Sequence, residues 1–106
     1  MMQDITCVNI NDKNDNPAGG IVRGVGLHID WQNGPLGRDE ERLVANGAFV
    51  QTVIAAALQR IEYYNSTKFR CRENSIAITK LEEALMWLDK RTRDRERRGV
   101  EGTHNE

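Results

Sequence analysis

The sequence predicts an α+β fold, in which a short N-terminal antiparallel β segment precedes an antiparallel two-helix hairpin. Early in the chain, apolar residues alternate with glycine or polar residues, which is the period of a strand with one buried face. Later they recur at spacings of three and four, the period of an amphipathic helix. The break at Asn33-Gly34-Pro35 separates the patterns, so we assign residues 1–36 to the β segment and residues 37–106 to the hairpin, packed as one domain.

The β segment is expected to contain two strands. Residues 4–10 are rich in β-branched types and form the first, whereas residues 11–20 collect Asn, Asp, Pro and Gly, which predicts a turn or exposed loop. Residues 21–32 form the second strand, because apolar side chains occupy every second position there. These positions are Val25, Leu27, Ile29 and Trp31. We expect the two strands to pair as an antiparallel ribbon.

The first helix follows a charged stretch at residues 38–42, and Asn46 or Gly47 is its candidate N-cap. Its apolar residues form one stripe that we expect to face the core. The stripe consists of Val50, Val53, Ile54, Ala57, Leu58 and Ile61. Residues 63–67 end this period and predict the connection to the next helix.

The second helix is expected to begin between Arg72 and Ser75, with Asn74 or Ser75 as its cap. It repeats the apolar stripe with Ala77, Ile78, Leu81, Ala84, Leu85 and Leu88. The short connection makes the two helices antiparallel neighbours. Met86 and Trp87 lie off the stripe, so we expect them to be buried either against the β ribbon or against another copy of the chain.

Composition narrows the possible functions. A chain of 106 residues suits one domain with a modest core, which makes oligomerisation a natural source of further burial. A net charge of −1 gives no overall field for nucleic acid or an anionic membrane. With neither a leader pattern nor a long apolar run, we expect a cytosolic protein. Cys7 and Cys71 have no metal-binding spacing and are expected to be reduced, structural thiols, with no metal bound.

The residues needed for catalysis are sparse. His28 lies in an expected strand and His104 in the tail, and neither belongs to a Ser/His/Asp or Cys/His grouping. Glu82 and Glu83 are adjacent and would point about 100° apart on a helix, so they do not form an acid/base pair. No phosphate-binding glycine motif is present. The sequence therefore predicts a protein that is not an enzyme and needs no cofactor.

The densest charge lies between Lys90 and Arg98, with six cations and two anions. One interpretation is a solvated helix end, because cations interact favourably with the partial negative charge at a helix C-terminus. The other is an anion site, since Arg91 and Arg95 lie one turn apart and both guanidinium groups can grip a phosphate or pyrophosphate. Nucleic-acid binding is the weakest alternative, because Asp94 and Glu96 interrupt the basic run.

Tyr64 and Asn74 suit a nucleotide, although an aromatic anchor and a helix cap are the simpler interpretations. An aromatic face stacks on a base, and an Asn amide hydrogen-bonds to polar edges. Asn74 and Arg91 are separated by 17 positions, which is about 25 Å along one helix. A small nucleotide does not span that distance, so a pocket that includes both residues must lie between two antiparallel hairpins. Such a site would imply a dimer.

Two segments of the chain resemble a known family. They are CRENSIAITKLEEALMWLDKRTRDRERRGVEGTH at residues 71–104 and GLHIDWQNGPL at residues 26–36. The first is similar to the helical-hairpin domain shared by the first Thoeris anti-defence family and the second anti-CBASS family of phage proteins, and the second segment favours the Thoeris group. The resemblance implies a sponge that binds glycocyclic ADP-ribose, a signal made by TIR-domain immune proteins, without cleaving it. Related members form hexamers with separate sites for cyclic trinucleotides.

The resemblance also implies a set of ligand-binding residues. The family pocket uses an aromatic residue, an Asn and two Arg, which fall here on Tyr64, Asn74, Arg91 and Arg95. Arg93 and Arg97 remain alternatives to Arg95. Two other functions stay open at this point. One is a sponge for cyclic di- or trinucleotides, and the other is a protein-interaction module that uses the face around Trp87.

Overall fold

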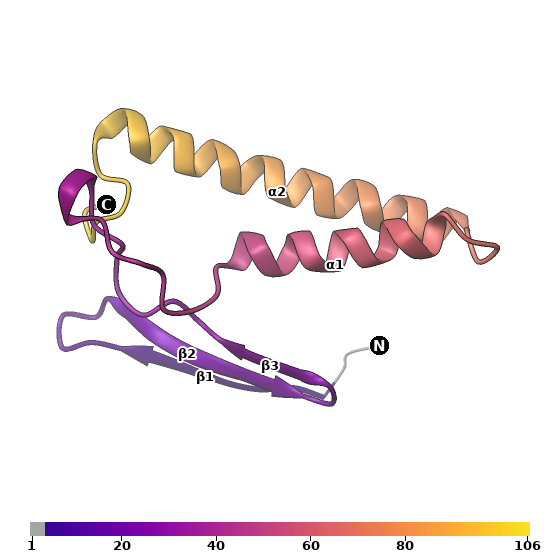
Figure 1. The fold of residues 1–106 in the computed structure, drawn as a ribbon, viewed down its shortest axis with the longest axis horizontal. Helices are drawn as coiled ribbons and strands as arrows, with labels where there is room; N and C mark the ends of the chain where they lie inside the picture. Colours follow the sequence, from indigo (N-terminus) through magenta and orange to yellow (C-terminus); the bar gives the residue numbers. More distant parts are fainter. Residues whose placement is uncertain (1–3) are drawn as a thin grey trace. The chain divides into compact units, whose positions relative to one another are not determined.

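A computed structural model of the protein describes residues 4–106 and confirms the α+β fold class. The chain forms two compact units. The sheet unit comprises Met1–Phe49 and Val100–Glu106, and the hairpin unit comprises Val50–Gly99. Figure 1 shows the strands and helices in chain order.

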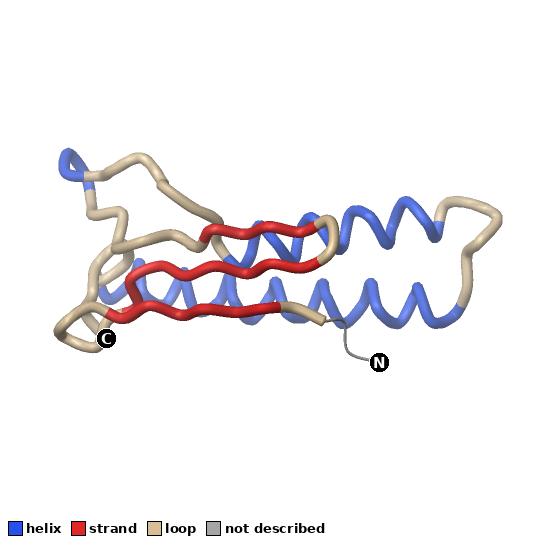
Figure 2. The backbone as a smooth tube through the Cα atoms, turned by 90° about the horizontal axis from the view of Figure 1, so that it is seen from below, coloured by secondary structure: helices blue, strands red, loops and turns tan. Residues whose placement is uncertain are grey.

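The sheet unit contains three antiparallel strands rather than two. They are β1 (Thr6–Asn11), β2 (Pro17–Gly24) and β3 (Leu27–Asp30), in the order β1-β2-β3 (Figure 2). The expectation of one strand over residues 21–32 is wrong, because a tight turn at Val25 and Gly26 divides it. Gly26 has a φ of 71°, which favours glycine, and Val25 is fully exposed at 105%. The alternation of apolar residues that predicted one strand therefore includes a turn between two strands.

Gly20 explains why β1 and β2 pair closely where a loop was expected. It lies opposite Asn9 with a φ of 154°, and a Cβ atom there would lie 2.4 Å from the carbonyl oxygen of Val8. Only glycine fits this position without moving the backbone. The expected loop over residues 11–20 is therefore shorter, because β2 already begins at Pro17. The neighbouring Val22, 9% exposed, is the one buried hydrophobic side chain within residues 4–106.

Asn46 organises a loop instead of capping the first helix. Its side chain accepts a hydrogen bond from the Asn33 N–H at 2.8 Å and donates one to the Asn33 carbonyl at 3.0 Å. Its own N–H donates to the Gln32 side chain at 2.9 Å. The expected cap at Asn46 or Gly47 is therefore wrong, and α1 begins at Val50.

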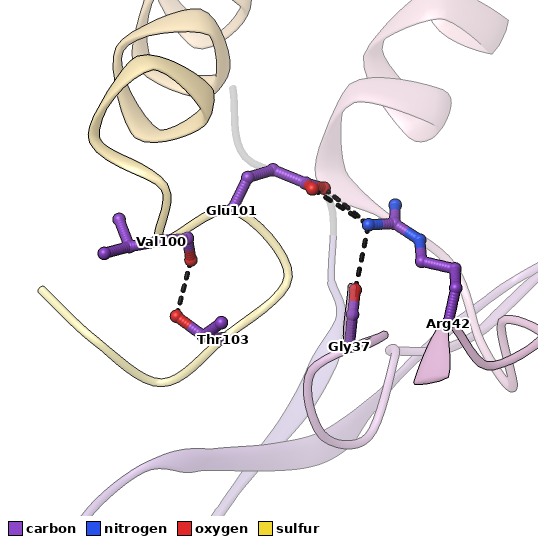
Figure 3. Close-up of polar contacts among 5 residues, drawn as sticks. All are labelled: Gly37, Arg42, Val100, Glu101 and Thr103. Carbon is purple, nitrogen blue, oxygen red and sulfur yellow. Dashed lines mark hydrogen bonds and ion pairs between the residues drawn. The ribbon is translucent and has the colours of Figure 1, made fainter. Parts of the chain in front are cut away.

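The C-terminal tail belongs to the sheet unit. Arg42 Nη1 donates to both carboxylate oxygens of Glu101, at 3.0 and 2.8 Å, and to the Gly37 carbonyl at 3.1 Å (Figure 3). The Gly37 N–H in turn donates to the Gly102 carbonyl at 2.8 Å. A Thr103 hydroxyl bond to the Val100 carbonyl closes the turn of the tail. We call the contacts of Arg42 with Gly37 and Glu101 the tail clamp.

The hairpin unit consists of α1 (Val50–Asn65) and α2 (Arg72–Arg98), which confirms the predicted helical hairpin (Figure 1). The predicted stripes are half-buried apart from Val50 and Ala57, and neither helix contains a fully buried residue. Helix α2 has 27 residues against 16 in α1, so its C-terminal part extends about 16 Å further. No helix in the described part of the chain is long and apolar enough to cross a membrane.

Cys71, rather than Asn74 or Ser75, caps α2. Its sulfur accepts a hydrogen bond from the Asn74 N–H at 3.4 Å, which is the role that a Ser or Asp oxygen usually has. The helix begins at Arg72, within the expected range, but both candidate caps lie inside it. At the other end Gly99 has a φ of 74° and its N–H bonds back to the Arg95 and Glu96 carbonyls, a common helix termination. Both cysteines are free and exposed.

Candidate ligand-binding site

The four predicted site residues lie at opposite ends of the hairpin unit. Tyr64 is in the last turn of α1 and Asn74 in the first turn of α2, so both belong to the connected end, which we call the turn end (residues 60–75). Arg91 and Arg95 belong to the part of α2 that extends beyond α1, which we call the arginine end (residues 89–98). The structure thus places one pair of residues at each end of the hairpin unit and does not bring the two pairs together.

Tyr64 is partly exposed and is held by a neighbouring cation. Its side chain is 44% exposed, and the Arg60 guanidinium carbon lies 4.8 Å from the centre of its ring. The same guanidinium lies 5.0 Å from the Tyr63 ring, and the two rings are 5.9 Å apart and tilted by 52°. These distances are typical of cation–π contacts. The turn end therefore presents an aromatic surface with a defined orientation.

Asn74 lies within a network of hydrogen bonds that joins the two helices. Its side-chain amide donates to the Phe69 carbonyl at 3.5 Å. Asn65, the last residue of α1, accepts from the Cys71 N–H and donates to the Ser75 hydroxyl, both at 3.1 Å. Three side chains thus fix the connection from both sides, and the Asn74 amide is half-buried. This arrangement suits a polar group that must meet a ligand edge in one orientation.

The arginine end has a different character. Arg91 is exposed and Arg95 is half-buried, and their one-turn spacing places both on one side of α2. Because α2 is continuous from Arg72 to Arg98, Asn74 and Arg91 are about 25 Å apart along its axis. The separation expected from the sequence therefore applies to the folded chain.

A second surface of α2 carries the alternative arginines. An open groove of about 870 Å³ is lined by Met86, Asp89, Lys90, Arg93, Glu96 and Arg97. Residues two positions apart on a helix point about 160° away from each other, so this face is opposite Arg91 and Arg95. Arg93 also forms an ion pair with Asp89 at 2.9 Å. Arg95 is thus the better-placed companion for Arg91, and Arg93 and Arg97 would serve a different surface.

Arg60 was not predicted from the sequence. Its signal was the spacing of three and four residues between a cation and two consecutive tyrosines, which places them on one helix face. The side-chain hydrogen bond with Tyr64 raises the pKa of Arg60 above its ordinary value. Within residues 4–106, no group of three His, Cys, Asp or Glu residues is arranged to hold a metal ion.

Comparisons with known proteins identify the family to which this chain belongs. A family model described as the hairpin domain of Acb2/Tad1 matches residues 24–93, a range that includes Tyr64, Asn74 and Arg91. The protein named Thoeris anti-defense 1 of Bacillus phage SBSphiJ7 is 51% identical over 76 residues, which cover 72% of this chain and 51% of that protein. The chain thus spans about half the length of this curated relative. Both matches confirm the resemblance seen in the sequence, and the chain belongs to the Acb2/Tad1 hairpin-domain family.

Proposed function

We propose that this chain is a phage anti-defence protein that binds and sequesters glycocyclic ADP-ribose without cleaving it. The observation that carries the proposal is the placement of two chemically complementary side-chain pairs at opposite ends of one hairpin, an aromatic and amide pair at the turn end and a cationic pair at the arginine end. A cyclic ADP-ribose has a base and a pyrophosphate that match these two chemistries. The name of the phage relative, Thoeris anti-defense 1, supports a role against Thoeris defence.

Each of the four residues has a role in this proposal. Arg91 and Arg95 bind the pyrophosphate, because guanidinium groups form charge-assisted bonds to phosphate oxygens. Tyr64 stacks on the adenine, and Asn74 hydrogen-bonds to the edge of the base or to a ribose. Each charge-assisted contact contributes about 1.5–3 kcal/mol. Sequestration requires no metal and no acid/base pair, since the ligand leaves unchanged.

The proposed site requires at least a homodimer, with a hexamer as the larger assembly that the family resemblance suggests. The separation of about 25 Å between the two pairs means that the turn end of one chain must meet the arginine end of another. Burial supports association, because one hydrophobic side chain is buried in the described chain while Met86 and Trp87 are each 69% exposed. We place this assembly in the cytosol of the infected bacterium.

Calorimetric titration with isomers of glycocyclic ADP-ribose tests the proposal. We expect tight binding at a stoichiometry near one ligand per chain, followed by release of the intact ligand when the protein is heated. Chromatography of the released material checks for cleavage. A titration without heat, or a cleaved product, would contradict the proposal.

Two alternatives remain open. In the first, the oligomer binds cyclic di- or trinucleotides, and titration of one ligand in the presence of the other separates shared from independent sites. In the second, the exposed Trp87 contacts a protein partner and no small molecule is bound. A monomeric chain with Trp87 accessible to a fluorescence quencher, and no heat with any nucleotide, would favour this second alternative.

A further inference from the structure

Arg60 forms the centre of an aromatic cluster at the turn end. It precedes Tyr63 and Tyr64 by three and four residues, so all three side chains lie on one face of α1. The guanidinium is close to both rings, at 5.0 Å from Tyr63 and 4.8 Å from Tyr64. Because the rings are tilted by 52°, a single planar cation contacts two differently oriented surfaces.

The two rings are the main partners of this cation. The ion pairs found within residues 4–106 do not include Arg60, so no carboxylate competes for its guanidinium. The guanidinium of an arginine stays charged at any pH at which the protein is folded, and the hydrogen bond with Tyr64 raises the pKa of Arg60 further. An exposed Tyr without such a partner would exchange between rotamers and lose entropy when a ligand fixed it.

The contact also makes the two faces of the Tyr64 ring different. The Arg60 guanidinium lies over one face of the ring, so in the proposed site the base stacks on the opposite face. A cation on one face also withdraws electron density from the ring, which favours stacking with an electron-rich purine on the other. Pre-orientation of this kind raises affinity by reducing the entropy lost on binding.

We infer that Arg60 is a positioning residue for base recognition, which holds Tyr64 in the orientation that stacks on the purine of the ligand. The inference rests on the proposed function, because it assigns Arg60 a role in the same site. Its guanidinium lies over the Tyr64 ring, so in this inference Arg60 acts on the base and not on the pyrophosphate. Its contribution should therefore depend on the presence of a base.

The test compares Arg60→Ala with Arg60→Lys and Lys68→Ala in the intact oligomer. Lys68 is a matched control, because its Nζ lies 5.3 Å from the Phe69 ring at the same end and its removal changes the charge equally. We expect Arg60→Ala to bind glycocyclic ADP-ribose about two- to fivefold more weakly, as the loss of one exposed cation–π contact predicts. Arg60→Lys should recover part of this loss, and Lys68→Ala should bind like the wild type.

Inorganic pyrophosphate serves as the probe without a base. Its weaker binding, followed by NMR chemical shifts, should be the same in the wild type and in Arg60→Ala. The inference would be overturned if Arg60→Ala lost affinity equally for both probes, or if Lys68→Ala lost as much affinity as Arg60→Ala. Either result would mean that Arg60 acts only through its charge. Tighter binding in Arg60→Ala would also overturn it, because Arg60 would then obstruct the ring.

The same experiment distinguishes failure of the inference from failure of the proposed function. A wild type that binds no cyclic ADP-ribose would overturn both. A wild type that binds tightly, with unchanged affinity in Arg60→Ala, would overturn only the role of Arg60. Thermal unfolding of each variant at one chain concentration checks that the comparison involves folded protein.

Discussion

At the turn end of the hairpin unit, Asn65 bonds to both Cys71 and Ser75, whereas at the arginine end α2 continues beyond α1 and its charged side chains are exposed apart from the half-buried Arg95. The turn end is held by hydrogen bonds among its own residues. The arginine end depends on long, flexible side chains whose charge acts over a wider range of positions. This difference fits the parts of a nucleotide, because a base must be met in one orientation and a phosphate mainly by charge.

The difference also bears on assembly. A rigid end and an adaptable end complement each other only when they come from different chains, because α2 separates them by about 25 Å within one chain. Antiparallel pairing of two hairpins would create two such contacts at once. The proposed ligand would then bridge the chains and stabilise the dimer.

Complementation between variants gives the largest expected effect. One chain carries Tyr64→Ala and Asn74→Ala, and the other carries Arg91→Ala and Arg95→Ala. Each variant alone should bind roughly a hundredfold more weakly or worse, because two contacts are lost. Refolded together at equal amounts, the chains should recover wild-type affinity in about a quarter of the sites, since both intact halves meet there at random.

Calorimetry measures both the affinity and the number of recovered sites. The control is each variant refolded alone under the same conditions. If the mixture contained no sites of wild-type affinity while it formed mixed oligomers, both halves of the site would belong to one chain. The comparison between the two ends would then lose its functional meaning.

The second prediction separates the two faces of the arginine end. Arg91→Ala should weaken binding of glycocyclic ADP-ribose by about tenfold or more, because one charge-assisted contact is lost. Arg97→Ala is the matched control, since it removes the same charge from the groove on the opposite face. Calorimetry at two salt concentrations measures both variants. A larger effect at Arg97 would move the phosphate site to the groove that contains Lys90 and Arg93.

The sequence was sufficient for the fold class because the helical stripes are long and regular. It placed the first strand correctly but merged β2 and β3 into one strand, because Gly24 and Gly26 alternate with apolar residues whether they lie in a strand or in a turn. It also favoured Asn74 and Ser75 as caps, since cysteine rarely takes that position. Both errors concern local hydrogen bonds and φ angles, which residue patterns specify only weakly.

Only part of the candidate site could be predicted from the sequence. The paired arginines follow from helical spacing, and the distance between Asn74 and Arg91 follows from the rise per residue. The cluster around Arg60 was missed because the search for periodicity followed apolar residues and not cation–aromatic pairs. Arg95 and Arg97 lie on opposite faces of α2. The choice between them as the companion of Arg91 required the structure, because the groove shows that Arg97 shares a surface with Arg93.

The third prediction concerns the preorganised end. Asn65→Ala removes the two hydrogen bonds that connect α1 to the start of α2 and should lower the free energy of unfolding by about 1–2 kcal/mol. Ligand affinity should also fall, because Asn74 loses its fixed position. Ser66→Ala is the control, since its hydroxyl bonds only to the Tyr63 carbonyl within the same turn. Urea unfolding at fixed chain concentration and calorimetry measure the two effects, and unchanged affinity would show that the network is not needed for binding.

The smallest effect is expected from the tail clamp of the sheet unit. Glu101→Gln weakens the contact with Arg42, which is a partly exposed ion pair at 2.8 Å, and should lower the free energy of unfolding by about 0.2–1 kcal/mol. The effect should shrink at high salt, because ions screen such pairs. Affinity for the ligand should stay the same, since Arg91 and Arg95 bind phosphate through charge on long side chains and do not need the tail to fix their position. A loss of affinity comparable to that of Asn65→Ala would mean that the arginine end also needs a fixed position, and the contrast between the two ends would no longer hold.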